Sequence, residues 1–289
     1  MSKRNDRILS VFAMLVIVVS MVWTQTGYAQ NPQKNIILTT TTSVQDSGLL
    51  DELLPVFEKQ TGYVVKTIAV GSGQAMAMGK RGEADVLIVH SPKAEEEFVK
   101  EGYGINRALI MHNYFVLVGP TNNPAKIVGT KSAKEAFKKI ADSGSLFVSR
   151  GDNSGTNALE KKIWQMAGIS TEGKTWYQQT GLGMGQTIGV ANEKLGYTLT
   201  DKATFLYLKK NLQLAMLLEE SEDLYNGYSV IELNPQKFSK INIEGGKAFA
   251  KFILSKKAQN IIKNYGIKKC GESLFFPDAL AKSKNKGRK

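Results

Sequence analysis

The sequence has a single cysteine and only two histidines among its 289 residues. Cys270 alone can form neither an internal disulfide nor a thiolate metal cluster. His90 and His112 each border an apolar stretch, where a structural histidine is expected. No Gly-x-Ser-x-Gly elbow surrounds a serine. These absences argue against an enzyme, so we predict no catalytic residues, no metal site and no cofactor.

Acidic residues are scarce as well, with 26 against 38 basic residues and a formal net charge of +12. Five of the bases lie in the last eight positions, residues 282–289, which contain no acid and no aromatic residue. Such an end is typical of a solvated tail, so we predict a basic, disordered tail there and no nucleic-acid partner. The remaining positive charge gives the body of the protein a mild bias toward anionic partners.

The first 29 residues have the layout of a secretory signal. Lys3, Arg4 and Arg7 precede an apolar run from Ile8 to Trp23 that only two serines interrupt. Small residues at positions 27 and 29 then favour cleavage after residue 29. The alternative is an uncleaved membrane anchor, but the run is short for a membrane span and is followed by small and polar residues. We therefore predict a signal peptide over residues 1–29 and a periplasmic mature protein.

The rest of the chain alternates strand and helix patterns, which is typical of an α/β fold built from parallel units. After an apolar strand pattern at 109–118, a Gly-Pro break at 119–120 predicts the first crossing between two lobes. The strand at 228–233 is expected to return the chain to the first lobe. These crossings predict two α/β lobes joined by a two-strand hinge, with the ligand cleft between them. Lobe 1 would comprise 30–119 and 226–281, and lobe 2 would comprise 120–225.

Two segments far apart in the chain share one design. Residues 39–48 (TTTTSVQDSG) and 149–156 (SRGDNSGT) each follow a strand, are rich in hydroxyl groups and reach Ser-Gly at a helix start. The Gly71-Ser72-Gly73 turn precedes a third helix. Helix N-termini expose unpaired N–H groups and carry a partial positive charge, so they bind anions. Each segment alone is more often an ordinary cap or turn, and only their combination predicts an oxyanion site.

An oxyanion without protons accepts hydrogen bonds and donates none, so hydroxyl and N–H groups suit it. Arg150 adds a permanent charge and a planar fork. Asp46 and Asp152 would repel an anion, so we expect them to act as caps or to orient Arg150 while facing away from the ligand. If either carboxylate pointed inward, a protonated ligand such as hydrogen phosphate would fit better. The predicted ligand-binding residues are Thr41, Thr42, Ser43, Ser72, Arg150, Ser154 and Thr156.

Taken together, these motifs resemble the periplasmic tungstate-binding proteins of ABC transporters. The matching blocks are TTTS at 40–43, DSGLL at 46–50, AVGSGQA at 69–75, ADVL at 84–87 and SRGDNSGT at 149–156, with shorter matches at 183–185, 191–193 and 197–201. The resemblance covers about 35–277 and implies a type II periplasmic-binding fold that delivers its ligand to an ABC permease and its ATPase. It also implies that Thr41, Ser72, Arg150 and Thr156 hold the anion without metal or water.

Tungstate is therefore the predicted ligand, with molybdate left open, and the predicted protein is a monomer. Two rival functions remain. One is a binding protein of the same class for phosphate or sulfate, since cavity size and ligand protonation decide between such anions. The other is a secreted phosphoryl-handling enzyme, which would need a base, a nucleophile or a metal beside the anion site.

Overall fold

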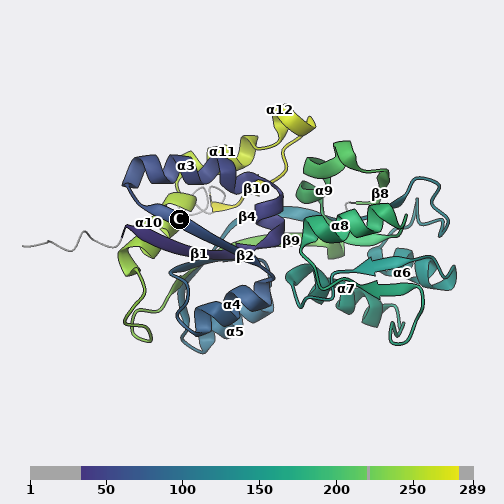
Figure 1. Cartoon of the computed structure of the whole chain (residues 1–289), viewed down its shortest axis with the longest axis horizontal. Helices are drawn as coiled ribbons and strands as arrows, with labels where there is room; N and C mark the ends of the chain where they lie inside the picture. The colour runs from purple at the N-terminus through teal and green to yellow at the C-terminus, as the bar shows by residue number, and fades with distance from the viewer. Residues whose placement is uncertain (1–33, 220–221, 280–289) are drawn as a thin grey trace, which may run out of the picture. The chain divides into compact units, whose positions relative to one another are not determined.

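A computed structural model describes residues 34–219 and 222–279 (Figure 1). The predicted signal peptide, 1–29, and the predicted basic tail, 282–289, lie outside the described residues. The strands are β1 (Asn35–Thr41), β2 (Val64–Val70), β3 (Val86–Val89), β4 (Gly104–Pro120), β5 (Phe147–Ser149), β6 (Tyr177–Gln179), β7 (Thr198–Asp201), β8 (Leu214–Leu218), β9 (Tyr225–Leu233) and β10 (Phe276–Pro277). The helices are α2 (Thr42–Asp46), α3 (Leu49–Thr61), α4 (Ser72–Lys80), α5 (Pro92–Lys100), α6 (Ala133–Asp142), α7 (Gly155–Met166), α8 (Met184–Glu193), α9 (Lys202–Leu208), α10 (Ile243–Ile253), α11 (Lys256–Asn264) and α12 (Ile267–Cys270), with 3-10 turns at Lys209–Asn211 and Glu222–Leu224.

The first core is built on the strands β2, β1, β3 and β9, which lie side by side in that order. Successive side chains of a strand point to opposite faces of the sheet. Accordingly, Val86 and Ile88 of β3 pack with α3, α10 and α11, whereas Leu87 and Val89 pack with α4 and α5. Figure 1 shows these two sets of helices on either side of the strands. The sheet is therefore covered on both faces, as expected for parallel β/α units.

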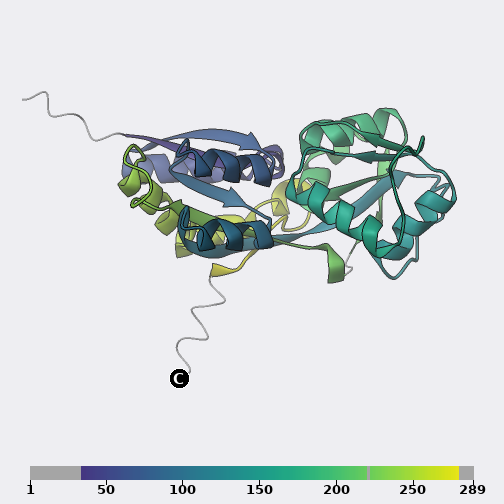
Figure 2. The same cartoon turned by 90° about the horizontal axis from the view of Figure 1, so that it is seen from below.

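The second core is built around β4, β5, β7 and β8. Phe115 and Leu117 of β4 pack with α6 and α7, while Val116 and Val118 pack with α8 and α9. β5 and β6 form a separate parallel pair. The helices thus gather in two groups, one around each core (Figure 2). This arrangement confirms the prediction of an α/β protein with two lobes.

Strand β4 passes from one core to the other without a break. Its residues up to Tyr114 pair with β9, and its residues from Phe115 pair with β7 and then β8. The Gly-Pro pair that we expected to mark the crossing stands at the far end of the strand, because pairing with β8 keeps Pro120 extended. β9 is the second connecting strand. The exact limits of the lobes stay a prediction.

The hydroxyl run at 39–43 was expected to follow a strand, but its first three residues are the end of β1. β1 continues to Thr41 because it pairs with β2 along its whole length and with β3 near its middle, and helix α2 starts at once with Thr42. The patterns did not predict β6, α9, β10 or α12, which are short and depend on neighbours distant in sequence. In the described ranges, no helix combines the length and the apolar character that a membrane crossing requires.

Candidate functional site

The hydroxyl run at 39–43 lies at the edge of the first sheet where the parallel strands end. β1 lies parallel to β2 and β3, so the three carboxyl ends meet at one edge of the sheet. Thr41 is the N-cap of α2, and its Oγ1 accepts a hydrogen bond from Val44 N over 3.4 Å. The same oxygen lies 3.1 Å from Ser43 Oγ. Both side chains are fully buried, so any ligand that reached them would be shielded from water.

Ser72 begins α4, at the end of β2, and is also fully buried. Its Oγ accepts a hydrogen bond from the backbone N–H of His90, which follows β3, over 3.3 Å. A Cβ added to Gly71 would lie 3.2 Å from the Cα of Ser154. The start of α4 in the first lobe therefore lies directly against the loop that precedes α7 in the second.

That loop joins β5 to α7 and carries the second hydroxyl-rich motif. Ser154 caps α7, since its Oγ accepts a hydrogen bond from Asn157 N over 3.2 Å. A Cβ on Gly155 would lie only 2.7 Å from the carbonyl oxygen of His90, so this approach requires glycine. The ends of β1, β2, β3 and β5 thus converge on one site, as the two matching motifs predict.

Arg150 supplies the positive charge of this site, and its side chain is 1 % exposed. Its Nη2 donates to Thr42 Oγ1 over 2.9 Å and to Asp152 Oδ2 over 2.5 Å. Its Nε and Nη1 have no acceptor within the described ranges. Burial lowers the pKa of Arg150, and the neighbouring Asp152 opposes that shift. A buried guanidinium with two unused donor nitrogens is a strong site for an anion.

Thr156 supplies a further donor without a partner. Its side chain is 1 % exposed, and its Oγ1 makes no hydrogen bond to any described residue. Buried polar groups in folded proteins are nearly always paired, so each exception calls for an explanation. Thr42 is half-buried, and its Oγ1 accepts from Arg150 and from Met184 N, which leaves its own proton to be donated.

The carboxylates near Arg150 are occupied by other partners. Asp46 Oδ2 accepts from Gly185 N over 2.8 Å, and Asp152 Oδ1 accepts from Ser154 N over 3.1 Å. Asp201 accepts from both the N–H and the hydroxyl of Thr204 over 2.8 Å. Burial raises the pKa of Asp46, and it raises the pKa of Asp201 to about 6. The roles expected for Asp46 as a cap and for Asp152 as the residue that orients Arg150 agree with these contacts.

His90 lies next to the site, although its place in the sequence gave it only a structural role. Its Nδ1 lies 2.8 Å from Asn226 Oδ1, and its Nε2 lies 3.4 Å from Ser43 Oγ. An amide oxygen can only accept, so Nδ1 carries the proton and Nε2 accepts from Ser43. Burial lowers the pKa of His90 to about 4 despite the bond to Asn226. The ring is therefore neutral at neutral pH and adds no charge to the site.

The neutral state of His90 makes a testable contribution to stability. Below pH 6.5 the unfolded chain binds a proton at this position, while the folded protein does not until about pH 4. The stability that His90 contributes should therefore be present above pH 6.5 and be lost as pH falls toward 4. In urea unfolding, we expect the advantage of the wild type over His90→Gln to shrink by about 2 kcal/mol between pH 7 and pH 5. An advantage that is the same at both pH values would contradict the buried neutral ring.

Glu160 lies on α7 and holds the end of β5 in place, and it was not identified from the sequence. It is 1 % exposed and accepts hydrogen bonds from Ser149 Oγ at 2.6 Å, Tyr177 Oη at 2.7 Å and Trp164 Nε1 at 3.1 Å. Burial raises the pKa of Glu160, and the bond from Ser149 is the largest opposing effect. Because Ser149 immediately precedes Arg150, this carboxylate helps to fix the position of the guanidinium. Acidic residues at helical positions are common, so no sequence signal separates Glu160 from surface glutamates.

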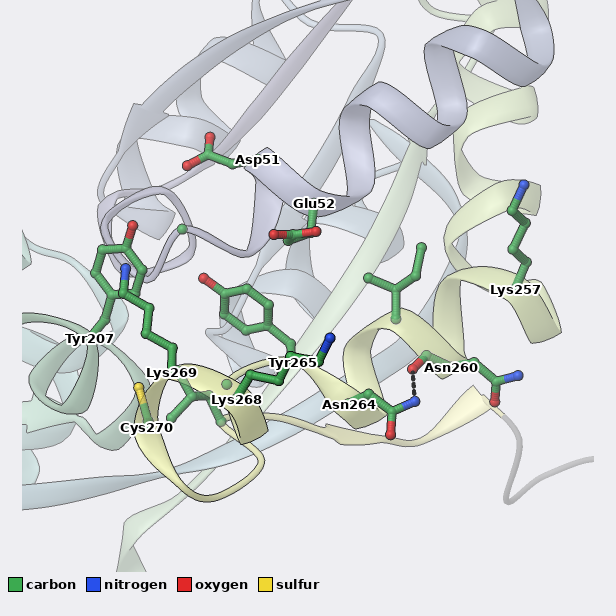
Figure 3. Close-up of a pocket in the computed structure, with 14 residues that line it drawn as sticks. Asp51, Glu52, Tyr207, Lys257, Asn260, Asn264, Tyr265, Lys268, Lys269 and Cys270 are labelled. Atoms are coloured by element: carbon green, nitrogen blue, oxygen red, sulfur yellow. Dashed lines mark hydrogen bonds between the residues drawn. The ribbon is translucent and has the colours of Figure 1, made fainter.

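The described residues line several cavities, one of which includes Thr42 and Asp46. Another of about 870 Å³, formed by α3, α9, α11 and α12, has carboxylates at Asp51 and Glu52 and ammonium groups at Lys257 and Lys268 (Figure 3). None of the seven predicted residues lines it. In residues 34–219 and 222–279, no group of three or more histidine, cysteine or acidic side chains could hold a metal ion. The structure brings all seven predicted residues to one place: Thr41, Thr42, Ser43, Ser72, Arg150, Ser154 and Thr156.

Comparison with known proteins finds one family model and several relatives whose names agree with one another. Residues 26–257 match the family model described as PBP superfamily domain. The tungstate-binding protein TupA of Peptoclostridium acidaminophilum is 45% identical over 284 residues, which are 94% of this chain and 99% of that protein. The crystal structure of the tungstate ABC transporter from Geobacter sulfurreducens is 42% identical, covers 81% of this chain and 100% of its own, and has a TM-score of 0.74. The structure of the tungstate-binding protein TupA from Desulfovibrio alaskensis G20 is 41% identical, covers 84% of this chain and 98% of its own, and has a TM-score of 0.70.

Proposed function

The chain belongs to the PBP superfamily and, within it, to the tungstate-binding proteins, and on this basis we propose that it captures tungstate for an ABC importer. The resemblance read from the motifs is thereby confirmed. The oxyanion occupies the cleft between the two lobes, held by the seven residues that converge there. The bound form is delivered to a membrane permease with its ATPase, and molybdate remains a second ligand to test.

One observation carries this proposal: the motif at 149–156 contains buried donors without acceptors. Arg150 Nε, Arg150 Nη1 and Thr156 Oγ1 are all shielded from solvent and unpaired in the described residues. Leaving a buried donor unpaired costs about 1 to 3 kcal/mol, and more for a charged group. A tetrahedral oxyanion offers several acceptor oxygens and a negative charge, so it would satisfy all three donors at once.

The protonation of the ligand argues for a fully ionised oxyanion over phosphate. Hydrogen phosphate carries a proton at neutral pH and would need an acceptor in the site. Asp46, Asp152 and Asp201 all accept hydrogen bonds from other groups. His90 directs its acceptor nitrogen toward Ser43. Arg150 Nε, Arg150 Nη1 and Thr156 Oγ1 are buried without a partner among the described residues, and such donors match an anion that only accepts.

Capture needs binding and closure, with no chemical step. Thr41, Ser43 and Ser72 belong to the first lobe, whereas Arg150 and Thr156 belong to the second. The anion bridges the two sets, and closure excludes water, which strengthens each charged hydrogen bond. Only the extra affinity of the ligand for the closed form stabilises that form, and a permease can recognise it. In this proposal the protein is a monomeric, periplasmic binding protein without cofactor or catalytic residue.

Isothermal titration calorimetry tests the proposal directly. We would titrate the mature protein with tungstate, molybdate, sulfate and phosphate, and then repeat the tungstate titration in an excess of sulfate or phosphate. Tight binding of tungstate that survives both competitors supports the proposal. Preferential binding of phosphate or sulfate would replace it with the rival function, and hydrolysis of a phosphate ester would indicate an enzyme.

The unpaired hydroxyl of Thr156 gives a selective prediction. Thr156→Val preserves the shape of the side chain and removes only the hydroxyl. We expect it to weaken tungstate binding by about 1.5 to 3 kcal/mol, because a hydrogen bond to a charged ligand is lost. The unfolding free energy of the ligand-free protein should not fall, since this hydroxyl has no partner among the described residues.

Thr130→Val is the matched control in the second lobe. The hydroxyl of Thr130 is also buried but donates to Ile127 O over 2.8 Å, and neither residue is among the seven predicted ligand-binding residues. This variant should lose about 1 kcal/mol of stability and bind tungstate with unchanged affinity. If Thr156→Val instead lost stability and kept its affinity, Thr156 would be a structural residue and not a ligand.

A further inference from the structure

Helix α8 begins without a cap of its own. Its N-cap is Gly183, which has no side chain to accept a hydrogen bond, and its first turn contains no acidic residue. The first N–H groups of any helix lack partners within that helix and need acceptors from elsewhere. α8 packs in the second core, through Ala191, so the acceptors would be expected from that lobe.

The acceptors come instead from α2 of the first lobe. Met184 N donates to Thr42 Oγ1 over 3.1 Å, and Gly185 N donates to Asp46 Oδ2 over 2.8 Å. The partners are 142 and 139 positions apart in the chain. A Cβ on Gly185 would lie 3.1 Å from Asp46 Oδ2, so glycine at this position allows the carboxylate to approach the backbone.

The same contact is linked to the anion site. Thr42 Oγ1 accepts from Met184 N and from Arg150 Nη2, so α2, α8 and the guanidinium meet at one hydroxyl. Asp46 makes no further hydrogen bond to a described residue. A carboxylate this close to a dianion would weaken binding unless it made a compensating contact. The N-terminus of α8, with its partial positive charge, is such a contact.

We propose that Asp46 is a positioning residue that keeps the lobes closed over the bound oxyanion by capping α8 from the facing lobe. The inference rests on the proposed function and adds a residue that does not touch the ligand. When the lobes separate, Gly185 loses its acceptor, so the cap favours only the closed form. Its contribution should therefore appear in the rate of ligand release more than in the rate of capture.

Substitutions at Asp46 separate the cap from the charge. Asn and Asp are about equally good N-caps, whereas alanine is a poor one. Asp46→Ala should therefore release tungstate about tenfold faster, the factor that corresponds to a typical cap. Asp46→Asn keeps the acceptor oxygen and removes the negative charge, so we expect release within about twofold of the wild type. An electrostatic role without capping predicts that both variants behave alike.

The experiment measures release of radiolabelled tungstate from the mature protein after a chase with excess unlabelled tungstate. Asp51→Ala is the matched control, because Asp51 is an exposed acid on the neighbouring helix α3 and should leave the rate unchanged. Urea unfolding without tungstate checks that every variant is folded. Slow release from wild type, Asp51→Ala and Asp46→Asn with fast release from Asp46→Ala supports the inference.

Two results would overturn it while leaving the proposed function intact. One is release from Asp46→Ala at the wild-type rate, and the other is equally fast release from the alanine and asparagine variants. If the wild type and Asp51→Ala retain no labelled tungstate at all, the proposed function itself fails and the inference fails with it.

Discussion

Arg150→Ala is expected to weaken tungstate binding by about 3 to 5 kcal/mol, which is roughly a hundredfold to a few thousandfold in Kd. The side chain is 1 % exposed, and its Nε and Nη1 are buried charged donors without a partner among the described residues. Removing it deletes those bonds and leaves Asp152 without its guanidinium partner, so the carboxylate would then repel the dianion. Titration calorimetry of the variant with tungstate measures the loss.

Two further variants isolate the cause. Arg150→Lys keeps the positive charge but loses the planar fork, so its affinity should lie between those of the wild type and the alanine variant. Arg81→Ala removes an exposed arginine that pairs with Glu83 on the surface, and it should bind like the wild type. If Arg150→Ala bound tungstate with a Kd within about twofold of the wild type, the anion would have to lie elsewhere.

Most of the fold follows from patterns that repeat within a single element. Helix α3 ends at Gly62, which is left-handed as a C-cap glycine should be, although Pro55 does not end the helix earlier. The buried strand β3 is a continuous apolar run, and so is the last part of β4 from Phe115 to Val118. The elements that were not predicted are short, such as α12 with four residues and β10 with two. β10 exists because Phe276 and Pro277 pair with β4, a contact that no local pattern indicates.

The residues that we propose to bind the anion could be selected from the sequence because each lies in a short local motif. One hydroxyl-rich segment that ends in Ser-Gly at a helix start can be an ordinary cap, but two of them in one chain predict an anion site. The two motifs face each other here. The partners of those residues were not predictable. His90, Glu160 and Gly185 act through contacts with residues outside their own local pattern. Gly181 and Gly183 before α8 and Gly185 in its first turn are a local signal, because repeated glycines at a helix start permit a close approach.

Glu160 shows how strongly such hidden partners can affect stability. Thr156 and Glu160 are one helical turn apart on α7, so the same face of the helix carries a free donor for the ligand and a buried carboxylate. That carboxylate accepts from three donors, two of which are the ring groups of Trp164 and Tyr177. Glu160→Ala would leave the donors buried and unpaired and would open a cavity. We expect a loss of about 3 to 6 kcal/mol in unfolding free energy, measured by urea denaturation.

A loss of this size is a large fraction of the stability of a typical domain, so the milder variant Glu160→Gln is needed beside it. Glutamine retains one acceptor oxygen for two of the donors but presents an amide N–H to the third, so its loss should be smaller. Glu193→Ala replaces an exposed glutamate on α8 and should stay within about 0.5 kcal/mol of the wild type. Because Ser149 precedes Arg150 and hydrogen-bonds to Glu160, Glu160→Gln should also bind tungstate less tightly while it remains folded. Full stability in Glu160→Ala would mean that the buried carboxylate is replaceable and that Arg150 is held in place by its contacts with Thr42 and Asp152 alone.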